Sequence, residues 1–383
     1  MSTKRRNLTI NDPEMPAVLS KLQNKTDFKS LRIKQLLALP DLTKTNDSPI
    51  KFLIDAIVNL RRFKNFDIIN VPEIVSVRNN FDLLNAPADH PSRQETDTYY
   101  PEKDWVLRTH TTVMWPYYFS EENMKKLETE GEIGALCFGK VYRKDEIDRS
   151  HYPAFHQIDG LYICRKDKKI IGILELTEVL VDIAKNIYGT DVEYQISEDT
   201  FPFTDPSLQI AIKGKNQWLE IVGAGVVHTR VLKNLDIDPS VYNGWAFGFG
   251  LERLAMIKME IPDIRIFWST DKRITGQFKD LNSRFQEISK YPMTYRDISF
   301  VVGKDTSLNN YYEIIRDCAG NLVEEVSLLD KYENKEKFGE NNISYTFHIV
   351  YRSNERTLTN DEVDKIQRLL IDRTRKELNA LVR

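Results

Sequence analysis

The chain has 383 residues, of which 41% are hydrophobic and 29% charged, and its formal net charge is −3. This length favours two domains, and the composition is typical of a soluble globular protein. The near-neutral charge excludes a strongly basic field, so a nucleic acid partner would have to bind local patches. The three cysteines form no CxxC pair, which argues against a zinc ribbon or disulfide framework and suits a reducing compartment.

The N-terminal region suggests neither a membrane span nor a targeting peptide. Apolar runs throughout the chain are shorter than the roughly 20 residues that a membrane helix needs. Early basic residues are present without an apolar segment, and an acidic residue follows by Asp12. We therefore expect no membrane contact and a cytoplasmic location, with an organelle matrix as the alternative. Residues 1–46 are predicted to form an extension with one short helix near Phe28–Leu39.

Residues 47–280 are predicted to form the main domain. A helix begins at Ser48 and Pro49, because serine is a favoured N-cap and proline fits the first helical position. Helical spacing then produces one apolar stripe, made of Ile50, Leu53, Ile54, Ile57 and Leu60. A strand closed by Pro72 follows it, and prolines interrupt the loop region beyond.

In the segment Val106–Phe119, Arg108, His110 and Thr112 alternate with Thr109 and Thr111. If it is extended, Arg108, His110 and Thr112 point to the same side. A single histidine is more often structural than catalytic, so this pattern alone leaves its role open. An amphipathic helix is expected over residues 120–130.

Two predicted strands surround a long polar loop within Phe138–Ile163. Alternation along the second strand places Gln157 and Asp159 on one face with apolar residues, and Arg143 ends the first strand. Buried polar groups need partners. These side chains therefore contact either each other or a ligand.

A helix over residues 172–189 precedes two strands joined by a Phe-Pro-Phe turn at 201–203. A further hairpin turn is expected at 214–217, followed by a strand in which Glu220 has apolar neighbours. A buried acid is costly unless it is paired or bound to a cation. The pattern therefore predicts a partner for Glu220.

Glycine and alanine alternate with aromatic residues in 244–250, before a helix that begins at about Leu251. Small residues let the backbone approach a ligand or another strand closely. The pattern is neither a dinucleotide fingerprint nor a P-loop. It does place Glu252 and Arg253 on the first helical turn beside the glycines, and an arginine there suits an anionic ligand.

Residues 279–290 are predicted to be a polar linker, and 289–383 a second domain. Its pattern is strand, helix, two strands and a long helix, with a final strand at the C-terminus as an option. Thr359 and Glu362 form a capping box at the start of the long helix. This order favours a ferredoxin-like unit over a generic α+β module.

Two of these segments resemble the signature motifs of one family. Residues 141–160 are similar to motif 2 of phenylalanyl-tRNA synthetases, and residues 244–268 to their motif 3. Further segments resemble the family in the family's order, at 89–93, 108–112, 201–207 and 218–225. Residues 290–302 and 351–363 resemble the ferredoxin-fold anticodon-binding domain, whose fusion behind the catalytic domain marks the single-chain, organellar-type form.

This resemblance implies an α+β fold, with a class II antiparallel sheet flanked by helices and a ferredoxin-like C-terminal domain. It implies an ATP- and Mg²⁺-dependent ligase that makes phenylalanyl-adenylate from L-phenylalanine and transfers the amino acid to tRNA(Phe). The implied enzyme needs no second subunit and is a monomer, with a homodimer as the alternative.

The resemblance also implies roles for individual residues. Arg143 would hold the α-phosphate of ATP during the reaction, and Arg253 would bind the ATP tail or the adenine. Glu220 would face Mg²⁺ or the nucleotide. These three residues are the expected catalytic and nucleotide-binding groups.

The amino acid substrate has its own implied contacts. Asp159 would pair with the ammonium group, and Phe201 and Phe203 would meet the ring edge-to-face. Ala246 would be the small residue at the para position of the ring. The remaining residues expected to line this site are His110, Thr112, Gln157 and Gly248.

The chain departs from the family pattern at two positions. Asp159 stands where the family usually has Glu, and Ala224 where it usually has Cys. No editing domain is recognised, so tyrosine would have to be rejected at the synthetic site. Two alternatives remain: a paralogue that binds RNA or an amino acid without charging tRNA, and a class II ligase for another amino acid or phosphoserine. The Phe-Pro-Phe turn and Ala246 favour a flat aromatic ring over a phosphate.

Overall fold

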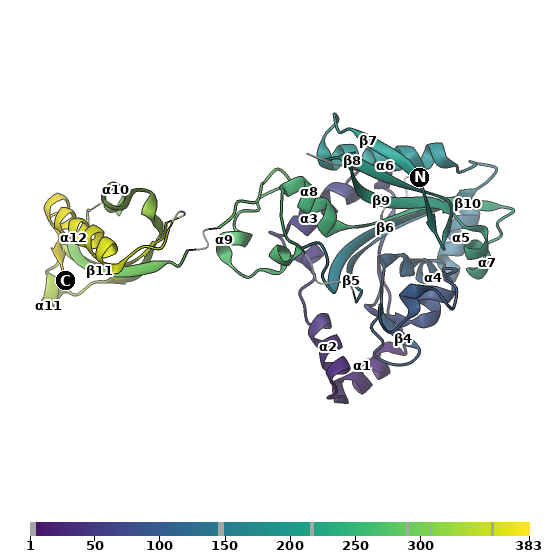
Figure 1. Cartoon of the computed structure of the whole chain (residues 1–383), viewed down its shortest axis with the longest axis horizontal. Coiled ribbons are helices and arrows are strands. Elements are labelled where there is room, and N and C mark those ends of the chain that lie inside the picture. Colours follow the sequence, from purple (N-terminus) through teal and green to yellow (C-terminus); the bar gives the residue numbers. More distant parts are fainter. Residues whose placement is uncertain (1–4, 145–148, 215–217, 289–290, 307, 354–355) are drawn as a thin grey trace. The chain divides into compact units, whose positions relative to one another are not determined.

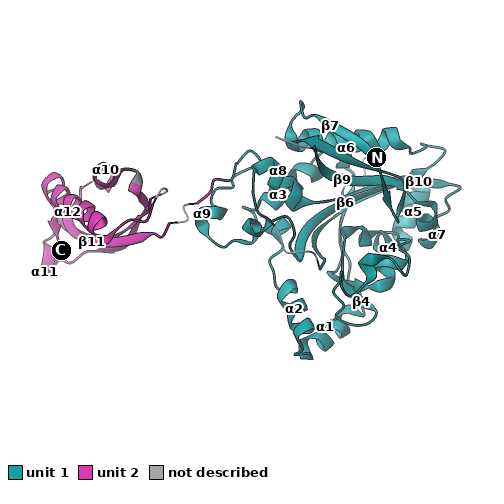
Figure 2. Ribbon diagram, viewed as in Figure 1, with its two compact units in different colours: residues 1–285 teal, residues 286–383 magenta. Residues whose placement is uncertain are grey.

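The computed structural model describes residues 5–144, 149–214, 218–288, 291–306, 308–353 and 356–383. The chain divides into two compact units, Met1–Phe285 and Gln286–Arg383 (Figure 2). Two features expected from the sequence lie partly outside the described residues, namely the polar loop after Arg143 and the turn at 214–217. None of the described helices combines the length and apolar character that crossing a bilayer requires.

An eight-stranded sheet forms the frame of unit 1 (Figure 1). The strand order is β1-β2-β5-β6-β10-β9-β8-β7, in which β1, β2 and β5 pair in parallel and all other neighbours are antiparallel. The strands are β1 Asn7–Thr9, β2 Asp67–Asn70, β5 Glu132–Tyr142, β6 Ala154–Arg165, β7 Tyr194–Phe201, β8 Thr204–Lys213, β9 Trp218–Val227 and β10 Tyr242–Gly250. A separate ribbon pairs β3 Ile74–Ser76 with β4 Trp105–Leu107.

The described residues of unit 1 form three hydrophobic cores, and in two of them the following helices pack against the sheet. One core contains apolar side chains of α3 (Pro49–Val58), α6 (Ile173–Tyr188) and α8 (Leu251–Met259). The other contains side chains of α4 (Met114–Tyr118), α5 (Glu121–Glu130) and α7 (Thr229–Asn234). The remaining helices of unit 1 are α1 Met15–Asn24, α2 Phe28–Leu37 and α9 Lys272–Thr275, with short 3-10 or π turns between elements. The helix-flanked sheet expected from the resemblance is confirmed.

Local sequence signals explain where several elements begin and end. The Ser48 side chain accepts a hydrogen bond from the backbone N–H of Ile50, and Pro49 is the first residue of α3, as predicted. Helix α5 is capped by Ser120 and ends at Gly131, whose φ of +75° suits glycine. The helix predicted over 172–189 is α6, and the one predicted near Leu251 is α8.

The N-terminal 46 residues hold more structure than the single helix predicted from the sequence. Helix α2 is the predicted one, but α1 and β1 precede it. Strand β1 pairs with β2, and the buried Asp67 accepts hydrogen bonds from Arg6, the residue just before β1. A three-residue strand has no measurable periodicity, so only its pairing with a distant strand defines it.

Unit 2 has its own four-stranded antiparallel sheet in the order β12-β13-β11-β14. Its hydrophobic core draws only on residues of this unit. Helix α12 begins with the predicted capping box, in which Thr359 and Glu362 bond reciprocally. The ferredoxin-like order is confirmed by β11 Thr294–Gly303, α10 Leu308–Ala319, β12 Val323–Tyr332, β13 Asn342–Tyr351, α12 Asn360–Glu377 and β14 Leu381–Val382, with the short α11 Lys335–Phe338 before β13.

Candidate active site

A cavity of about 530 Å³ opens against the middle strands of the unit 1 sheet. Strands β6, β10 and β9 are consecutive neighbours there, which brings segments far apart in the sequence together. Most residues singled out from the sequence line this cavity, namely His110, Thr112, Arg143, Gln157, Asp159, Phe201, Phe203, Ala246 and Gly248.

Asp159 lies on β6 directly opposite Gly248 on β10, and only 4% of it is exposed. Thr111 and Thr112 both donate hydroxyl hydrogen bonds to its carboxylate, the second at 2.7 Å. Burial raises the pKa of Asp159 to about 6, although the two hydroxyls and Arg143 oppose this rise. A Cβ at Gly248 would lie 2.5 Å from a carboxylate oxygen, so only glycine leaves room for Asp159.

Thr111 was missed by the sequence reasoning, because the segment is not extended throughout. His110 has an extended backbone, but Thr111–Val113 form a 3-10 turn, so two consecutive threonines reach one carboxylate. Arg108 does not join His110 in the cavity, which corrects the alternation expected for this segment. Its guanidinium is buried and donates to the carbonyls of Lys140 and Val71 at 2.7 and 2.9 Å.

Three polar atoms in the cavity wall have no partner among the described residues: Nδ1 of His110, Oε1 of Gln157 and Nε1 of Trp115. Buried polar atoms are normally hydrogen-bonded, so unpaired ones in a cavity indicate a ligand position. Burial, with a contribution from Arg143, lowers the pKa of His110 to about 3. The imidazole is therefore neutral and offers hydrogen bonds rather than charge.

The opposite end of the cavity is aromatic. The rings of Phe201 and Phe203 stack with centroids 5.9 Å apart and planes at 4°. Trp115 meets Phe203 edge-on at 6.0 Å. Phe201 lies directly over Gly223, where a Cβ would be 2.6 Å from the ring. Ala246 completes this end, and only 4% of it is exposed.

Arg143 provides the cation of the cavity wall and follows the last residue of β5. Its Nε donates to the carbonyl of Thr109 at 3.0 Å, and its guanidinium lies 5.3 Å from the ring centroid of Phe155. These contacts hold the permanent positive charge of Arg143 in place at the cavity wall.

Glu220 and Arg253 do not line the cavity. Glu220 is exposed on β9, so the burial expected from its apolar sequence neighbours is wrong. With its amide nitrogen turned toward this carboxylate, Gln209 on β8 donates to both oxygens at 2.9 and 3.1 Å. Arg253 is exposed on the first turn of α8, whereas its neighbour Glu252 is buried.

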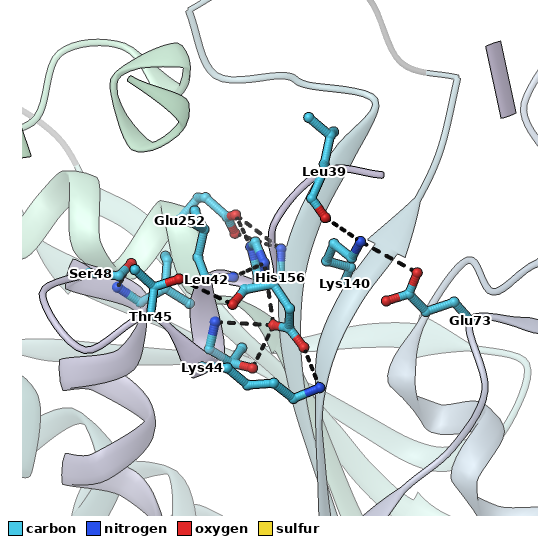
Figure 3. Close-up of polar contacts among 12 residues, drawn as sticks. Leu39, Leu42, Lys44, Thr45, Ser48, Glu73, Lys140, His156 and Glu252 are labelled. Carbon is cyan, nitrogen blue, oxygen red and sulfur yellow. Dashed lines mark hydrogen bonds and ion pairs between the residues drawn. The ribbon is translucent and has the colours of Figure 1, made fainter. Parts of the chain in front are cut away.

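Glu252 belongs to a buried network that ties α8 to β6 (Figure 3). Its carboxylate accepts hydrogen bonds from the backbone N–H of His156, at 2.8 and 3.0 Å, and from Nδ1 of the same residue at 2.7 Å. The other ring nitrogen accepts from the backbone N–H of Leu42 at 3.0 Å. His156 directly precedes Gln157, and Glu252 directly precedes Arg253. The network therefore fixes the backbone next to both of these predicted site residues.

A lysine extends these contacts to the end of α2 (Figure 3). Lys140 on β5 donates to the carbonyls of Leu37 and Leu39 at 3.0 and 2.6 Å, and it pairs with Glu73 at 3.4 Å. Only 3% of the Lys140 side chain is exposed. Residues 37–42 are therefore anchored to β5 and to β6, the strand that carries Gln157 and Asp159.

Residues 35–278 match the family described as tRNA synthetases class II core domain (F), and residues 289–383 match the ferredoxin-fold anticodon binding domain. The chain is 38% identical to the chloroplastic/mitochondrial phenylalanine–tRNA ligase of Arabidopsis thaliana over 358 residues, covering 89% of this chain and 80% of that protein. The chain belongs to the phenylalanine–tRNA ligase family.

Other members of this family match in the same way. The mitochondrial phenylalanine–tRNA ligase of Mus musculus is 35% identical over 333 residues, covering 77% of this chain and 70% of that protein. The phenylalanine–tRNA ligase alpha subunit of Coxiella burnetii is 39% identical over 234 residues, covering 60% of this chain and 67% of that subunit. The core-domain match includes Leu42, which contacts His156, so the buried network lies wholly within it.

Replacing His156 with Ala should lower the free energy of unfolding of unit 1 by about 2–4 kcal/mol, because the buried Glu252 carboxylate and the Leu42 N–H both lose their partner. His156→Asn is the matched variant, since its amide can still donate to Glu252. Urea unfolding of both variants tests this, and we expect a smaller loss for Asn. Equal losses, or none, would contradict the assignment.

Proposed function

We propose that the chain activates L-phenylalanine with ATP and transfers it to tRNA(Phe). The observation that carries this proposal is the cavity itself, which has a buried carboxylate at one end and stacked phenylalanines at the other. An α-amino acid with an apolar aromatic side chain matches both ends. Family membership supports the same reaction, because the relatives are named phenylalanine–tRNA ligases.

In this proposal the substrate ammonium pairs with Asp159 and the ring enters between Phe201, Phe203 and Ala246. The unpaired atoms of His110 and Gln157 would hold the amino and carboxylate ends. The tyrosine hydroxyl would have no hydrogen-bond partner at the apolar end, which disfavours tyrosine. Thr112 and Gly248 support the site by holding and accommodating Asp159.

The first step is attack of the substrate carboxylate on the α-phosphorus of ATP, with pyrophosphate as the leaving group. Arg143 would stabilise the charge that develops on the α-phosphate oxygens. A ribose hydroxyl at the 3′ end of tRNA then attacks the carbonyl carbon, and AMP leaves. Neither step requires a covalent bond between the substrate and a side chain of the cavity.

ATP would extend beyond the cavity toward Arg253, whose exposed guanidinium makes no hydrogen bond or ion pair with any described residue and suits a polyphosphate or an adenine. Mg²⁺ usually keeps phosphate and water ligands and takes one or two carboxylates. The described residues contain no cluster of three metal-binding side chains. Glu220, an exposed carboxylate, fits the role of a single protein ligand to Mg·ATP.

Phenylalanine-dependent exchange of pyrophosphate into ATP tests the proposal. The purified chain should catalyse this exchange without a second subunit, and phenylalanine should exceed every other amino acid tested in parallel. Preference for another amino acid would favour a different class II ligase. Exchange without charging of tRNA would favour the paralogue that does not aminoacylate.

The relatives also bear on location and assembly. Those from Arabidopsis thaliana, Drosophila melanogaster and Mus musculus are named as chloroplastic or mitochondrial proteins. These names favour the organelle matrix over the cytoplasm that the sequence first suggested. Together with the fused anticodon-binding domain they also favour a single chain that acts without a second subunit.

Replacing Ala246 with Gly should widen the range of accepted substrates. Ala246 lines the aromatic end of the cavity, and removal of its methyl group leaves space beyond the ring. We expect exchange with 4-chlorophenylalanine to rise at least about tenfold, since one methyl-sized change is worth ~1–3 kcal/mol. Phenylalanine itself is the internal control. An unchanged substrate range would remove Ala246 from the para position.

A chain that ends at Phe285 should keep adenylate formation and lose tRNA charging. The cavity and the hydrophobic cores around it lie within unit 1, whereas unit 2 has a separate core. Exchange and aminoacylation are measured side by side on the full and shortened chains. Loss of both activities in a folded protein would show that unit 2 is part of the catalytic core.

A further inference from the structure

A second groove of about 320 Å³ borders the active-site region of unit 1. One wall is the first part of α2, in the N-terminal segment, and the other is the segment 95–100. Its lining residues are Phe28, Lys29, Arg32, Ile33, Glu95, Thr98, Tyr99, Tyr100 and Lys144. None of the substrate contacts proposed above uses this groove.

The groove lies next to the active-site cavity. Thr98 lines both spaces, and Asp97, which lines the cavity, accepts a hydrogen bond from the backbone N–H of Lys144 at 2.8 Å. Lys144 directly follows Arg143, the residue proposed to hold the α-phosphate. A chain lying in the groove would therefore lead toward the place where the adenylate forms.

The charges of the groove favour an anion. Its lining carries three cations, Lys29, Arg32 and Lys144, against one carboxylate, Glu95. Lys29 pairs with that carboxylate at 2.8 Å, and the Lys144 ammonium donates to the backbone carbonyl of Glu95, so the three cations and one carboxylate leave the lining with a net positive charge. Arg32 is exposed, and no hydrogen bond or ion pair joins it to the described part of the chain.

Aromatic rings accompany these cations. Phe28 is 85% exposed at the start of α2, an unusual exposure for a phenylalanine. The Lys144 ammonium lies 5.1 Å from the ring centroid of Tyr99. A positive groove with aromatic faces is the combination that binds single-stranded nucleic acid, because phosphates pair with the cations and bases stack on the rings.

We propose that this groove binds the single-stranded 3′ end of tRNA(Phe), guiding its terminal ribose into the cavity. The proposal rests on the function proposed above, since it names where the second substrate of that reaction lies. A base would stack on Phe28, and backbone phosphates would contact Arg32 and Lys144. The groove thereby gives α2 a role in the transfer step and none in adenylate formation.

Two single variants with matched controls test this proposal. Phe28→Ala is compared with Leu31→Ala, which removes an exposed apolar side chain of the same helix outside the groove. Arg32→Ala is compared with Arg61→Ala, which removes an exposed arginine elsewhere in unit 1. For each protein we measure pyrophosphate exchange, tRNA charging, and affinity for tRNA(Phe) with and without its last four nucleotides.

We expect Phe28→Ala to weaken binding of intact tRNA by about tenfold, within the range for loss of one base stack. Arg32→Ala should weaken it too and reduce the slope of log affinity against log salt by about 1, because one phosphate contact is lost. Both variants should keep normal exchange, and the shortened tRNA should bind to them as it binds to the unaltered chain. Both controls should bind intact tRNA normally.

Each other outcome overturns the proposal. Normal charging and affinity in both variants would show that the groove does not bind tRNA. Equal losses with intact and shortened tRNA would place another part of the RNA there. A change of oligomeric state in both Phe28→Ala and Leu31→Ala would identify a contact between two copies of the chain. Absence of exchange in the unaltered chain, by contrast, would refute the proposed function and not this groove alone.

Discussion

Replacing Asp159 with Asn should reduce kcat/KM for phenylalanine by about 100-fold or more in pyrophosphate exchange. The buried carboxylate is proposed to pair with the substrate ammonium, and loss of one partner from such a pair costs ~2–5 kcal/mol. Asp159→Glu is the matched variant, since it keeps the charge and restores the residue usual in the family. An Asn variant with normal kcat/KM would exclude this pairing.

The pH dependence of the same step follows from the pKa of about 6 at Asp159. Only the ionised carboxylate pairs with an ammonium group, and kcat/KM reports the free enzyme. We therefore expect kcat/KM for phenylalanine to fall about tenfold per pH unit below pH 6. A profile flat down to pH 5 would contradict this.

Asp159→Asn should also make the protein without bound substrate more stable than the unaltered chain at pH 8. The folded-state pKa of Asp159, about 6, lies well above the usual value for an aspartate. The stability that this group contributes is therefore complete below about pH 4 and is lost as the pH rises through about 6. Each unit of pKa shift corresponds to ~1.4 kcal/mol, so the ionised carboxylate lowers the free energy of unfolding by up to about 3 kcal/mol at pH 8. Asn does not ionise. Urea unfolding at pH 5 and pH 8 should show a stability difference in favour of Asn that grows with pH.

Replacing Arg143 with Ala should lower the rate of adenylate formation by about 1000-fold and change phenylalanine binding much less. Removing one preorganised donor from a developing negative charge typically costs ~10²–10³ in kcat. Arg143 is held by Thr109 and Phe155, so its charge is fixed in place before the reaction. Single-turnover formation of adenylate, with phenylalanine affinity measured separately, distinguishes the two effects.

Arg143→Lys is the matched variant for this prediction. A lysine keeps the charge but lacks the planar fork that donates to Thr109 while stacking on Phe155, so we expect only partial recovery. The Ala variant should also shift the pH profile for phenylalanine toward higher pH, because Arg143 helps to keep the pKa of Asp159 down. An unchanged rate in the Ala variant would remove Arg143 from the phosphate.

Several features could be predicted because their cause is local. Ser48 with Pro49, and Thr359 with Glu362, set helix starts through contacts no more than three residues apart. Alternation along 154–165 set which side chains share a face of β6, so Gln157 and Asp159 were found together. Such patterns need no knowledge of the rest of the fold.

Other features depended on parts of the chain that are distant in sequence. Thr111 contacts Asp159 because a 3-10 turn replaces the expected extended segment. Glu220 kept an apolar sequence context and is nevertheless exposed, since the elements around a strand decide which of its faces is covered. Glu252 was expected with Arg253 on the first helical turn beside the glycines, but its carboxylate is buried and bonded to His156, 96 residues away in the sequence.

The sequence by itself therefore determined the family resemblance, the order of most helices and strands, and nine of the residues that line the cavity. Tertiary structure alone decided which carboxylates are buried, that Arg108 is structural, and that α2 forms a basic, aromatic groove with residues 95–100 and Lys144. The physical reason is the distance along the chain over which each kind of interaction acts. Capping and alternation act between near neighbours, whereas burial, ion pairing and pKa depend on every element packed around a group.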